Sequence, residues 1–239
     1  MRMSTEALKT KTDSDSPHGR RPAAARWALI ATLSVAVSTL IPGPAGATPS
    51  PATPDSREGG VFIPTDPGKI DPAPRFGKRV LKVGMTGPDV KVLRSMVTSR
   101  TLGLRSIGVR NIFDDATHAA VRKFQARSGL KRNGIVNRKT SSRLIRAMPR
   151  NGASWYGAPL FGNNTACGQK FTPTIVGVAH KTLPCGTRVL IGYRGRFLLT
   201  RVIDRGPYTP GRTWDLSHAA MIALGYQGID PVRHLIVGK

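Results

Sequence analysis

Acidic side chains are scarce in this sequence of 239 residues. Asp and Glu together number 13 against 37 Lys and Arg, which gives a formal net charge of +24 at pH 7. The shortage is most marked from Asn151 to Lys239, where there is no glutamate and the only acids are Asp204, Asp215 and Asp230. If this last part of the chain performs acid–base chemistry, we expect Asp204 or Asp215 to carry it.

Long hydrophobic runs are also rare, and one lies near the N-terminus. Residues 27–41, WALIATLSVAVSTLI, follow a basic stretch and precede the small-residue sequence AGA at 45–47, a pattern typical of a secretory signal peptide. A membrane anchor is the alternative, but a span needs roughly 20 apolar residues. We expect residues 1–47 to direct export by the general route, with Arg20 and Arg21 raising twin-arginine export as an alternative. No stable membrane anchor is expected after cleavage.

The strong positive charge predicts an anionic partner. Nucleic acid is the usual partner of so basic a chain. An exported chain instead meets wall polyanions or anionic lipid headgroups first, so we expect no nucleic acid partner and a location in the cell wall or outside the cell.

Cysteine is represented only by Cys167 and Cys185. Outside the cytoplasm such a lone pair most often forms one disulfide, and closing a loop of this length contributes about 3 kcal/mol on a loop-entropy argument. A zinc site would need further ligands, and His180, His218 and His234 lack metal-binding spacing with the cysteines. We therefore expect a structural disulfide, no metal and no cofactor.

The chain changes character twice before its last third. Residues 48–78 are rich in proline and glycine and are predicted to form a disordered linker. Residues 79–148 contain three segments with helical spacing of apolar residues: PDVKVLRSMV, DDATHAAVRKFQARSG and GIVNRKTSSRLIRAM. They predict a small three-helix bundle whose size favours a binding function.

The motifs of this bundle resemble a known family. LKVGMTGPDVKVLR, followed by FDDATHAAVRKFQ and GIVNRKT, is similar to the peptidoglycan-binding domain found beside many wall hydrolases. Phe113, Val121 and Phe124 are expected to be core residues rather than ligand contacts. The basic stretch SRTLGLRSIGVRN before Phe113 favours anionic wall polymers as an additional partner.

Residues 151–239 lose the helical period. ASWYG, TIVGVAH, RVLIGY, FLLTRVID and HLIVG are short β-rich runs separated by Gly and Pro, which indicates a small barrel. One helix, SHAAMIALG, interrupts them; Asp215 or Ser217 can cap it and Gly225 ends it.

These β-rich motifs also resemble a family. ASWYG, TACGQKF, GVAHKTLPCGTRV, VIDRGPY and WDLSHAAMIALG occur in the order of the rare lipoprotein A-like double-psi β-barrel, which expansins share. The resemblance implies a mainly β plus α protein, with a six-stranded double-psi β-barrel over residues 151–239 preceded by the three-helix bundle. Members of the first family include lytic transglycosylases that cut peptidoglycan glycan strands, whereas expansins loosen walls without hydrolysis.

The resemblance also implies roles for individual residues. Asp204 and His180 match catalytic positions, and Tyr156 and Thr165 match positions that line the polysaccharide groove. Gln169 stands where active members carry a glutamate, and we assign it to substrate binding. Two-carboxylate glycoside hydrolysis therefore lacks its second acid unless Asp215 substitutes.

A lytic transglycosylase can work with one carboxylate instead of two, because its nucleophile is the 6-hydroxyl of the substrate itself. Asp204 alone could act first as acid and then as base if burial raises its pKa. The alternatives are structural: Asp204 as a turn former, His180 as a satisfied histidine, Asp215 as a helix cap and Tyr156 as packing. Trp155, which alternates with Tyr156 along the strand, is expected to be core.

Three functions remain open from the sequence. The first is a secreted lytic transglycosylase that binds peptidoglycan and uses Asp204. The second is a non-catalytic, expansin-like wall-binding or wall-loosening protein, which Gln169 favours. The third is binding of extracellular nucleic acid or lipid through charge alone, which high salt would abolish.

Overall fold

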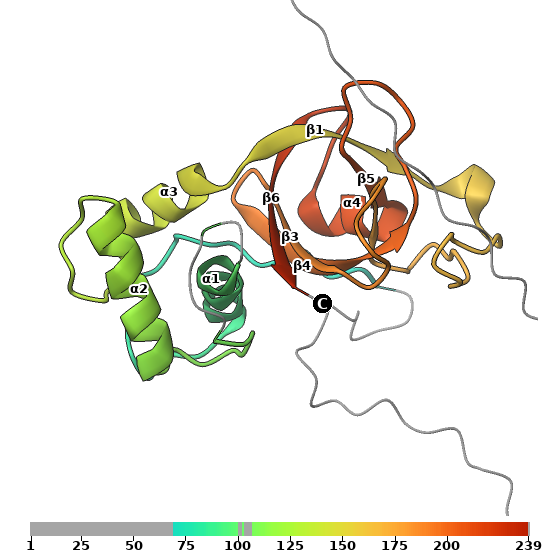
Figure 1. Ribbon diagram of the computed structural model, residues 1–239. Helices are drawn as coiled ribbons and strands as arrows, with labels where there is room; N and C mark the ends of the chain where they lie inside the picture. Colours follow the sequence, from blue (N-terminus) through green and yellow to red (C-terminus); the bar gives the residue numbers. More distant parts are fainter. Residues whose placement is uncertain (1–68, 100–101, 103–106, 239) are drawn as a thin grey trace, which may run out of the picture. The chain divides into compact units, whose positions relative to one another are not determined.

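The computed structural model describes residues 69–99, 102 and 107–238 (Figure 1). The predicted signal peptide, residues 1–47, lies outside this part of the chain, as do residues 48–68 of the predicted linker. None of the helices in the described ranges combines the length and the apolar character that crossing a membrane requires.

Three helices precede the barrel, as predicted. They are α1, Pro88–Thr98, α2, Asp115–Arg127, and α3, Arg138–Ala147. Pro88 begins α1, where the missing backbone N–H has no helical partner to lose. Asp114 caps α2 by accepting a hydrogen bond from the amide of Thr117, and Asn137 caps α3 by accepting one from the amide of Thr140. Phe113, Val121 and Phe124 are buried in the helical core, as expected.

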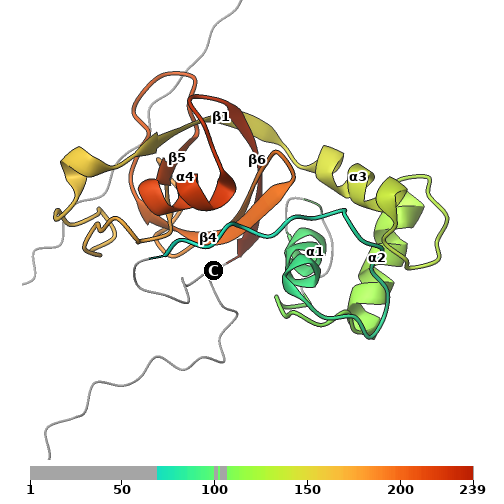
Figure 2. The same cartoon turned by 180° about the vertical axis from the view of Figure 1, so that it is seen from behind.

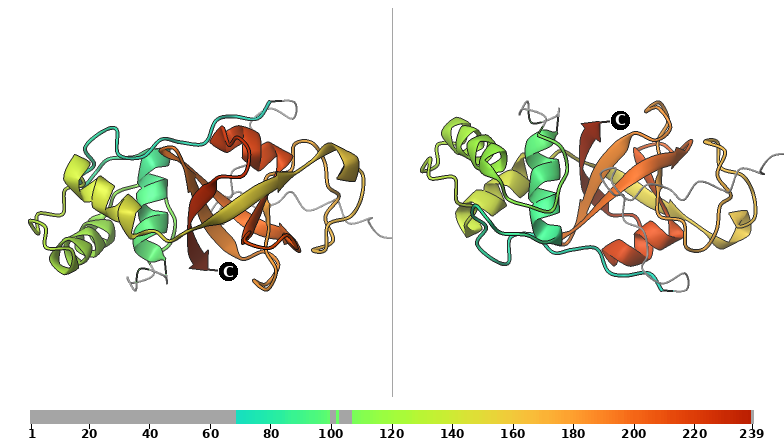
Figure 3. Two further views of the ribbon diagram at one scale, coloured as in Figure 1. Left: turned by 90° about the horizontal axis from the view of Figure 1, so that it is seen from above. Right: turned by 90° about the horizontal axis from the view of Figure 1, so that it is seen from below.

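Six strands form a closed barrel, which confirms the predicted fold class. They are β1, Arg150–Tyr156, β2, Val178–Ala179, β3, Arg188–Tyr193, β4, Arg196–Asp204, β5, Trp214–Ser217, and β6, Pro231–Gly238. Their order around the barrel is β1-β5-β2-β4-β3-β6. The run TIVGVAH contributes only the two residues of β2, so most of it is irregular. A short 3₁₀ turn, Ala158–Leu160, follows β1, and Figure 3 shows β1 running from the end of α3 across the barrel.

One helix, α4, His218–Leu224, lies against the barrel. Its cap is Ser217, whose hydroxyl accepts a hydrogen bond from the amide of Ala220. It ends at Gly225, whose φ of 61° is left-handed, as predicted. Asp215 lies in β5, before the helix begins. The expectation that Asp215 is a helix cap is therefore wrong, and its carboxylate is available for another role.

The helices and the barrel share one apolar core. On the barrel side this core contains Leu190, Phe197, Leu199, Leu235 and Val237, each at most 6% exposed. They alternate along β3, β4 and β6 with residues that face the barrel interior. The outer face of these three strands is thus buried against the helices rather than exposed to water.

Residues 69–78, the last part of the predicted linker, are also packed on the fold (Figure 2). The Ala73 amide donates to the Ala223 carbonyl of α4, and the Phe197 amide of β4 donates to the Pro74 carbonyl. Ala73 and Phe76 are 1% and 4% exposed. These ten residues therefore belong to the folded unit, because their backbone finds hydrogen-bond partners and their apolar side chains find a core.

Candidate active site

A groove of about 280 Å³ crosses the ends of four barrel strands. Two carboxylates, several aromatic rings and two arginines line it: Ser154, Trp155, Tyr156, Leu160, Ala179, Asp204, Arg205, Tyr208, Arg212 and Asp215, among others. It contains two of the three acids of the last third of the chain. Aromatic rings and charged groups thus lie together along this one groove.

Strand register brings the two carboxylates together. Ser154 of β1 pairs with Asp215 of β5, and Ala179 of β2 pairs with Asp215 on one side and with Asp204 of β4 on the other. These four residues form one row across the sheet, with only Ala179 between the two acids. Two strand spacings, about 10 Å, separate the backbones of Asp204 and Asp215, and the small Ala179 side chain leaves the space between them open.

A β-bulge turns Asp204 toward this row. Val178 pairs with Val202 and Ala179 pairs with Asp204, so Ile203 is an extra residue on β4. Val202 is fully buried in the barrel core, and strict alternation from it would point Asp204 inward. The extra residue resets the alternation, as bulges do beside active sites. Asp204 consequently lines the groove.

Two backbone amides hold the Asp204 carboxylate. Its Oδ1 accepts hydrogen bonds from the amides of Ala166 and Arg205, both at 2.8 Å. The Arg205 contact is the local turn predicted from the sequence. The Ala166 contact comes from a distant loop, so Asp204 also positions that loop over the groove. These two bonds fix the orientation of the Asp204 side chain at the groove.

Asp215 has different surroundings. Burial raises the pKa of its carboxyl above the ordinary value of 3.8, the Ser154 hydroxyl and Arg212 oppose that rise, and the charge of Asp204 adds to it. Its Oδ1 is buried and has no hydrogen-bond partner. An acid that lines a groove and has a raised pKa suits proton donation.

Aromatic side chains form the walls of the groove. Tyr156 is half-buried and stacks on Phe171, with ring centroids 4.6 Å apart, and its hydroxyl has no partner. Burial, Asp204 and Asp215 all raise the pKa of Tyr156, so its hydroxyl stays protonated and can donate. Trp155 and Tyr208 are 44% and 79% exposed. The expectation that Trp155 is core is therefore wrong. Trp155 and Tyr156 are the last two residues of β1, and both line the groove.

Thr165 and Gln169 lie next to the groove but do not line it. They close a tight turn in which the Gln169 amide donates to Thr165 Oγ1. Cys167, inside this turn, forms the expected disulfide with Cys185, with 5.7 Å between the two Cα atoms. The turn, the disulfide and the Ala166 amide that binds Asp204 thus form one connected loop, residues 165–169.

His180 also lies outside the groove lining. Its Nδ1 accepts from the amides of Thr182 and Leu183, and its ring packs 4.6 Å from that of Trp214. Burial and Arg205 lower the pKa of His180, so it is neutral and carries its proton on Nε2. These contacts fix the turn after β2, where the His180 amide donates to the Asp204 carbonyl.

The structure thus brings together Asp204 and Tyr156 of the predicted residues, and it adds Asp215, Trp155, Tyr208 and Arg212. The WDLS motif contained the signal for Asp215, since an acid next to a buried Trp alternates to the opposite face of a strand. Among the described residues no group of histidine, cysteine and acidic side chains could hold a metal ion.

Two protein families match this chain. Residues 151–234 match the family described as "Lytic transglycolase", and residues 86–144 match the family described as "Putative peptidoglycan binding domain". The resemblance drawn from the sequence motifs is confirmed for both regions.

Several curated relatives are similar to part of this chain. A probable endolytic peptidoglycan transglycosylase RlpA from a Synechocystis species is 40% identical over 92 residues, 38% of this chain and 29% of that protein. The endolytic peptidoglycan transglycosylase RlpA of Yersinia pestis is 51% identical over 70 residues, 28% of this chain and 19% of that protein. The corresponding protein of Neisseria meningitidis is 31% identical over 137 residues, 54% of this chain and 57% of that protein.

The chain therefore spans less than a third of the length of the first two relatives. The chain thus contains two regions that match known families: residues 86–144 match the peptidoglycan-binding family, and residues 151–234, which form most of the barrel, match the lytic transglycolase family.

Proposed function

We propose that this protein binds peptidoglycan in the bacterial cell wall and cleaves its glycan strands by lytic transglycosylation in the groove. The observation that carries the proposal is the row of Asp204, Ala179 and Asp215 across the barrel. The family matches of both domains and the names of the relatives support the substrate.

Asp204 and Asp215 divide the acid–base work in this proposal. Asp215 donates its proton to the glycosidic oxygen as that bond breaks. Asp204, oriented by two backbone amides, faces the positive charge that develops on the sugar ring and accepts the proton of the attacking 6-hydroxyl. No glutamate is needed at position 169, because Asp215 provides the second acid of the site.

The other residues act on binding and position. Tyr156 donates a hydrogen bond to the sugar, and Trp155 and Tyr208 offer exposed rings for stacking on sugar faces. Thr165 and Gln169 shape the loop that covers one side of the groove. His180 is a positioning residue: it fixes the turn after β2, whose backbone donates to the Asp204 carbonyl, and it leaves proton transfer to the two acids.

Mass spectrometry of soluble products from purified peptidoglycan tests the proposal. The full chain and Asp115→Asn, a matched change of an exposed acid in α2, should release anhydro-muropeptides. Asp204→Asn and Asp215→Asn should each be slower by at least about 100-fold, the usual contribution of a general acid or base.

Two results would contradict this function. Undiminished products from both site variants would show that the groove is not the site of cleavage. No product from any form, with binding to insoluble wall intact, would assign the protein to the non-catalytic, expansin-like class.

A further inference from the structure

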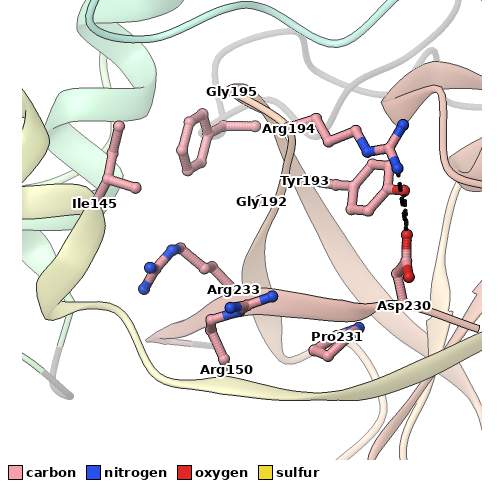
Figure 4. Close-up of a pocket in the computed structure, with 10 residues that line it drawn as sticks. Ile145, Arg150, Gly192, Tyr193, Arg194, Gly195, Asp230, Pro231 and Arg233 are labelled. Atoms are coloured by element: carbon pink, nitrogen blue, oxygen red, sulfur yellow. Dashed lines mark hydrogen bonds and ion pairs between the residues drawn. The ribbon is translucent and has the colours of Figure 1, made fainter.

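A second cavity, of about 390 Å³, shares no lining residue with the groove. It is lined by α3, the start of β1, the turn between β3 and β4, and the start of β6 (Figure 4). Its charged residues are Arg150, Arg194, Arg233 and Asp230. The cavity volume lies in the range of ligand pockets. Neither the packing of the helices nor the reaction proposed for the groove accounts for the positive charge of this cavity.

Two of these arginines face each other without an acid. Arg150 of β1 and Arg233 of β6 are direct partners in an antiparallel pair, where like charges repel. Burial, together with the charges of Arg150 and Arg146, lowers the pKa of Arg233. Within the described ranges, no carboxylate lies within salt-bridge distance of Arg146, Arg150 or Arg233. The cluster is thus an unneutralised positive site.

The third arginine occupies an unfavourable backbone conformation. Arg194 and Gly195 form the two-residue turn between β3 and β4, with φ values of 44° and 80°. Turns of this type favour Asn, Asp or Gly at the first position, because other side chains strain the left-handed backbone. Arg194 is the one residue other than glycine with positive φ in the described ranges. Strained residues of this kind gather at functional sites.

The single acid of the cavity is already engaged. The Tyr193 hydroxyl donates to Asp230 Oδ2, and Arg194 lies 3.7 Å from the same oxygen. Arg150 and Arg233 lie together, apart from this group (Figure 4). Asp230 therefore holds Arg194 in place. Arg233 donates from Nη1 to the Met148 carbonyl at 2.8 Å, which orients its guanidinium, and neither Arg233 nor Arg150 pairs with an acid among the described residues.

We propose that this cavity binds a phosphate group of a phosphodiester polymer in the cell wall. Guanidinium forks match the oxygen geometry of phosphate and bind it through paired, charge-assisted hydrogen bonds. Such an anion would relieve the repulsion between Arg150 and Arg233. The phosphate chemistry follows from the cavity alone, whereas the choice of a wall polymer rests on the proposed function. The site would hold the protein on a polyanion while the groove acts on neighbouring glycan.

Calorimetric titration of the full chain with inorganic phosphate tests the site directly. Wild type should bind phosphate saturably, and Arg150→Gln/Arg233→Gln should weaken binding at least about tenfold, since hydrogen bonds between charged groups are worth that much. The matched control is Arg122→Gln/Arg138→Gln, which removes two exposed charges from α2 and α3 and should bind as wild type does. Equal affinity in the cavity variant, or an equal loss in the control, would overturn the proposal.

The melting temperature of a single variant tests the repulsion between Arg150 and Arg233. Without ligand, Arg150→Gln should melt at a higher temperature than wild type, because it removes a like-charge pair, and it should still bind phosphate more weakly. A lower melting temperature would contradict the repulsion argument.

Competition experiments identify the source of the phosphate. Poly(glycerol phosphate) should compete with phosphate and bind more tightly, because it offers several phosphate groups. Binding of the protein to vesicles of phosphatidylglycerol and phosphatidylcholine should not depend on Arg150 and Arg233. Binding of the vesicles and not of the polymer would overturn the wall source. Peptidoglycan cleavage plays no part in these readouts, so they stand or fall separately from the proposed function.

Discussion

Asp204 and Asp215 show how one functional group acquires two roles. Both lie on the same face of the barrel, and only Ala179 of β2 lies between them across the sheet. Two backbone amides donate to Asp204, whereas Asp215 is half-buried and its buried Oδ1 has no hydrogen-bond partner. The backbone therefore fixes the position of Asp204, whereas the raised pKa of Asp215 suits it to hold and release a proton.

The pH dependence of cleavage should report Asp215. A proton donor loses activity as the pH rises through its pKa, so a raised pKa extends activity to higher pH. Arg212 lowers the pKa of Asp215. We expect Arg212→Gln to move the high-pH limb of the rate profile to higher pH, measured by product release. Lys181→Gln, an exposed change outside the groove, should leave the limb in place; equal limbs in all three forms would remove Asp215 from proton transfer.

The free energy of unfolding should also depend on pH through the raised pKa of Asp215. Between the ordinary Asp pKa of 3.8 and the raised pKa of Asp215, the folded chain binds more protons than the unfolded chain. The free energy of unfolding therefore falls as the pH rises through this window. Asp215→Asn avoids the buried charge and should melt at a higher temperature than wild type at pH 7, with the gap closing below pH 3.8. A constant gap at all pH values would contradict this explanation.

The sequence predicted Asp204 as a site residue but assigned Asp215 to a helix cap. The prediction of Asp204 rests on local features, whereas the position of Asp215 in the groove depends on the register of the strands. The motif D-R-G-P marks a strand end and a turn, which are local features. The bulge at Ile203 and the pairing of Ala179 with both acids involve strands far apart in the chain, and no local pattern specifies them.

At the scale of elements, the loop 165–169 depends on its disulfide. It lacks regular secondary structure, yet its Ala166 amide must stay 2.8 Å from Asp204. Cys167→Ser/Cys185→Ser should lower the free energy of unfolding by about 3 kcal/mol and also reduce the cleavage rate. Urea denaturation and product release check the two effects. A stable variant with full activity would show that the loop needs no tether.

The helical domain depends on one buried arginine. Arg94 of α1 is 1% exposed, pairs with Asp114, and donates to the carbonyls of Gly108 and Ile112. Replacing it by Met would leave these groups unpaired, and we expect a loss of about 3–5 kcal/mol in the free energy of unfolding. Arg122→Met on the exposed face of α2 should change it by less than about 0.5 kcal/mol. Equal effects in urea denaturation would contradict the role of Arg94.

Helix positions were predictable because their signals are local. Pro88 at the start of α1 and the apolar spacing of α2 are visible within one or two turns. The packed residues 69–78 were not predictable, since proline and glycine content favours a linker. Their order depends on partners on α4 and β4, such as Ala223 and Phe197.

At the scale of the whole molecule, helices and barrel should unfold together. The outer face of the barrel is part of the helical core, and the Ser99 hydroxyl donates to the Ile236 carbonyl of β6. With Trp27→Phe, fluorescence reports only Trp155 and Trp214 in the barrel, while far-UV circular dichroism reports the helices. The two urea transitions should coincide. Loss of the helical signal at lower urea would show that the domains are independent.

The closure of the barrel has a consequence for the time course of folding. β1 pairs with β5 and β6, the last two strands of the chain. Its backbone groups therefore have no strand partners until residues 214–233 have been synthesised. Long-range pairing of this kind makes folding slow and leaves strand edges open in the meantime. The helices, whose contacts are mostly local, can form earlier and offer a surface on which the later strands assemble.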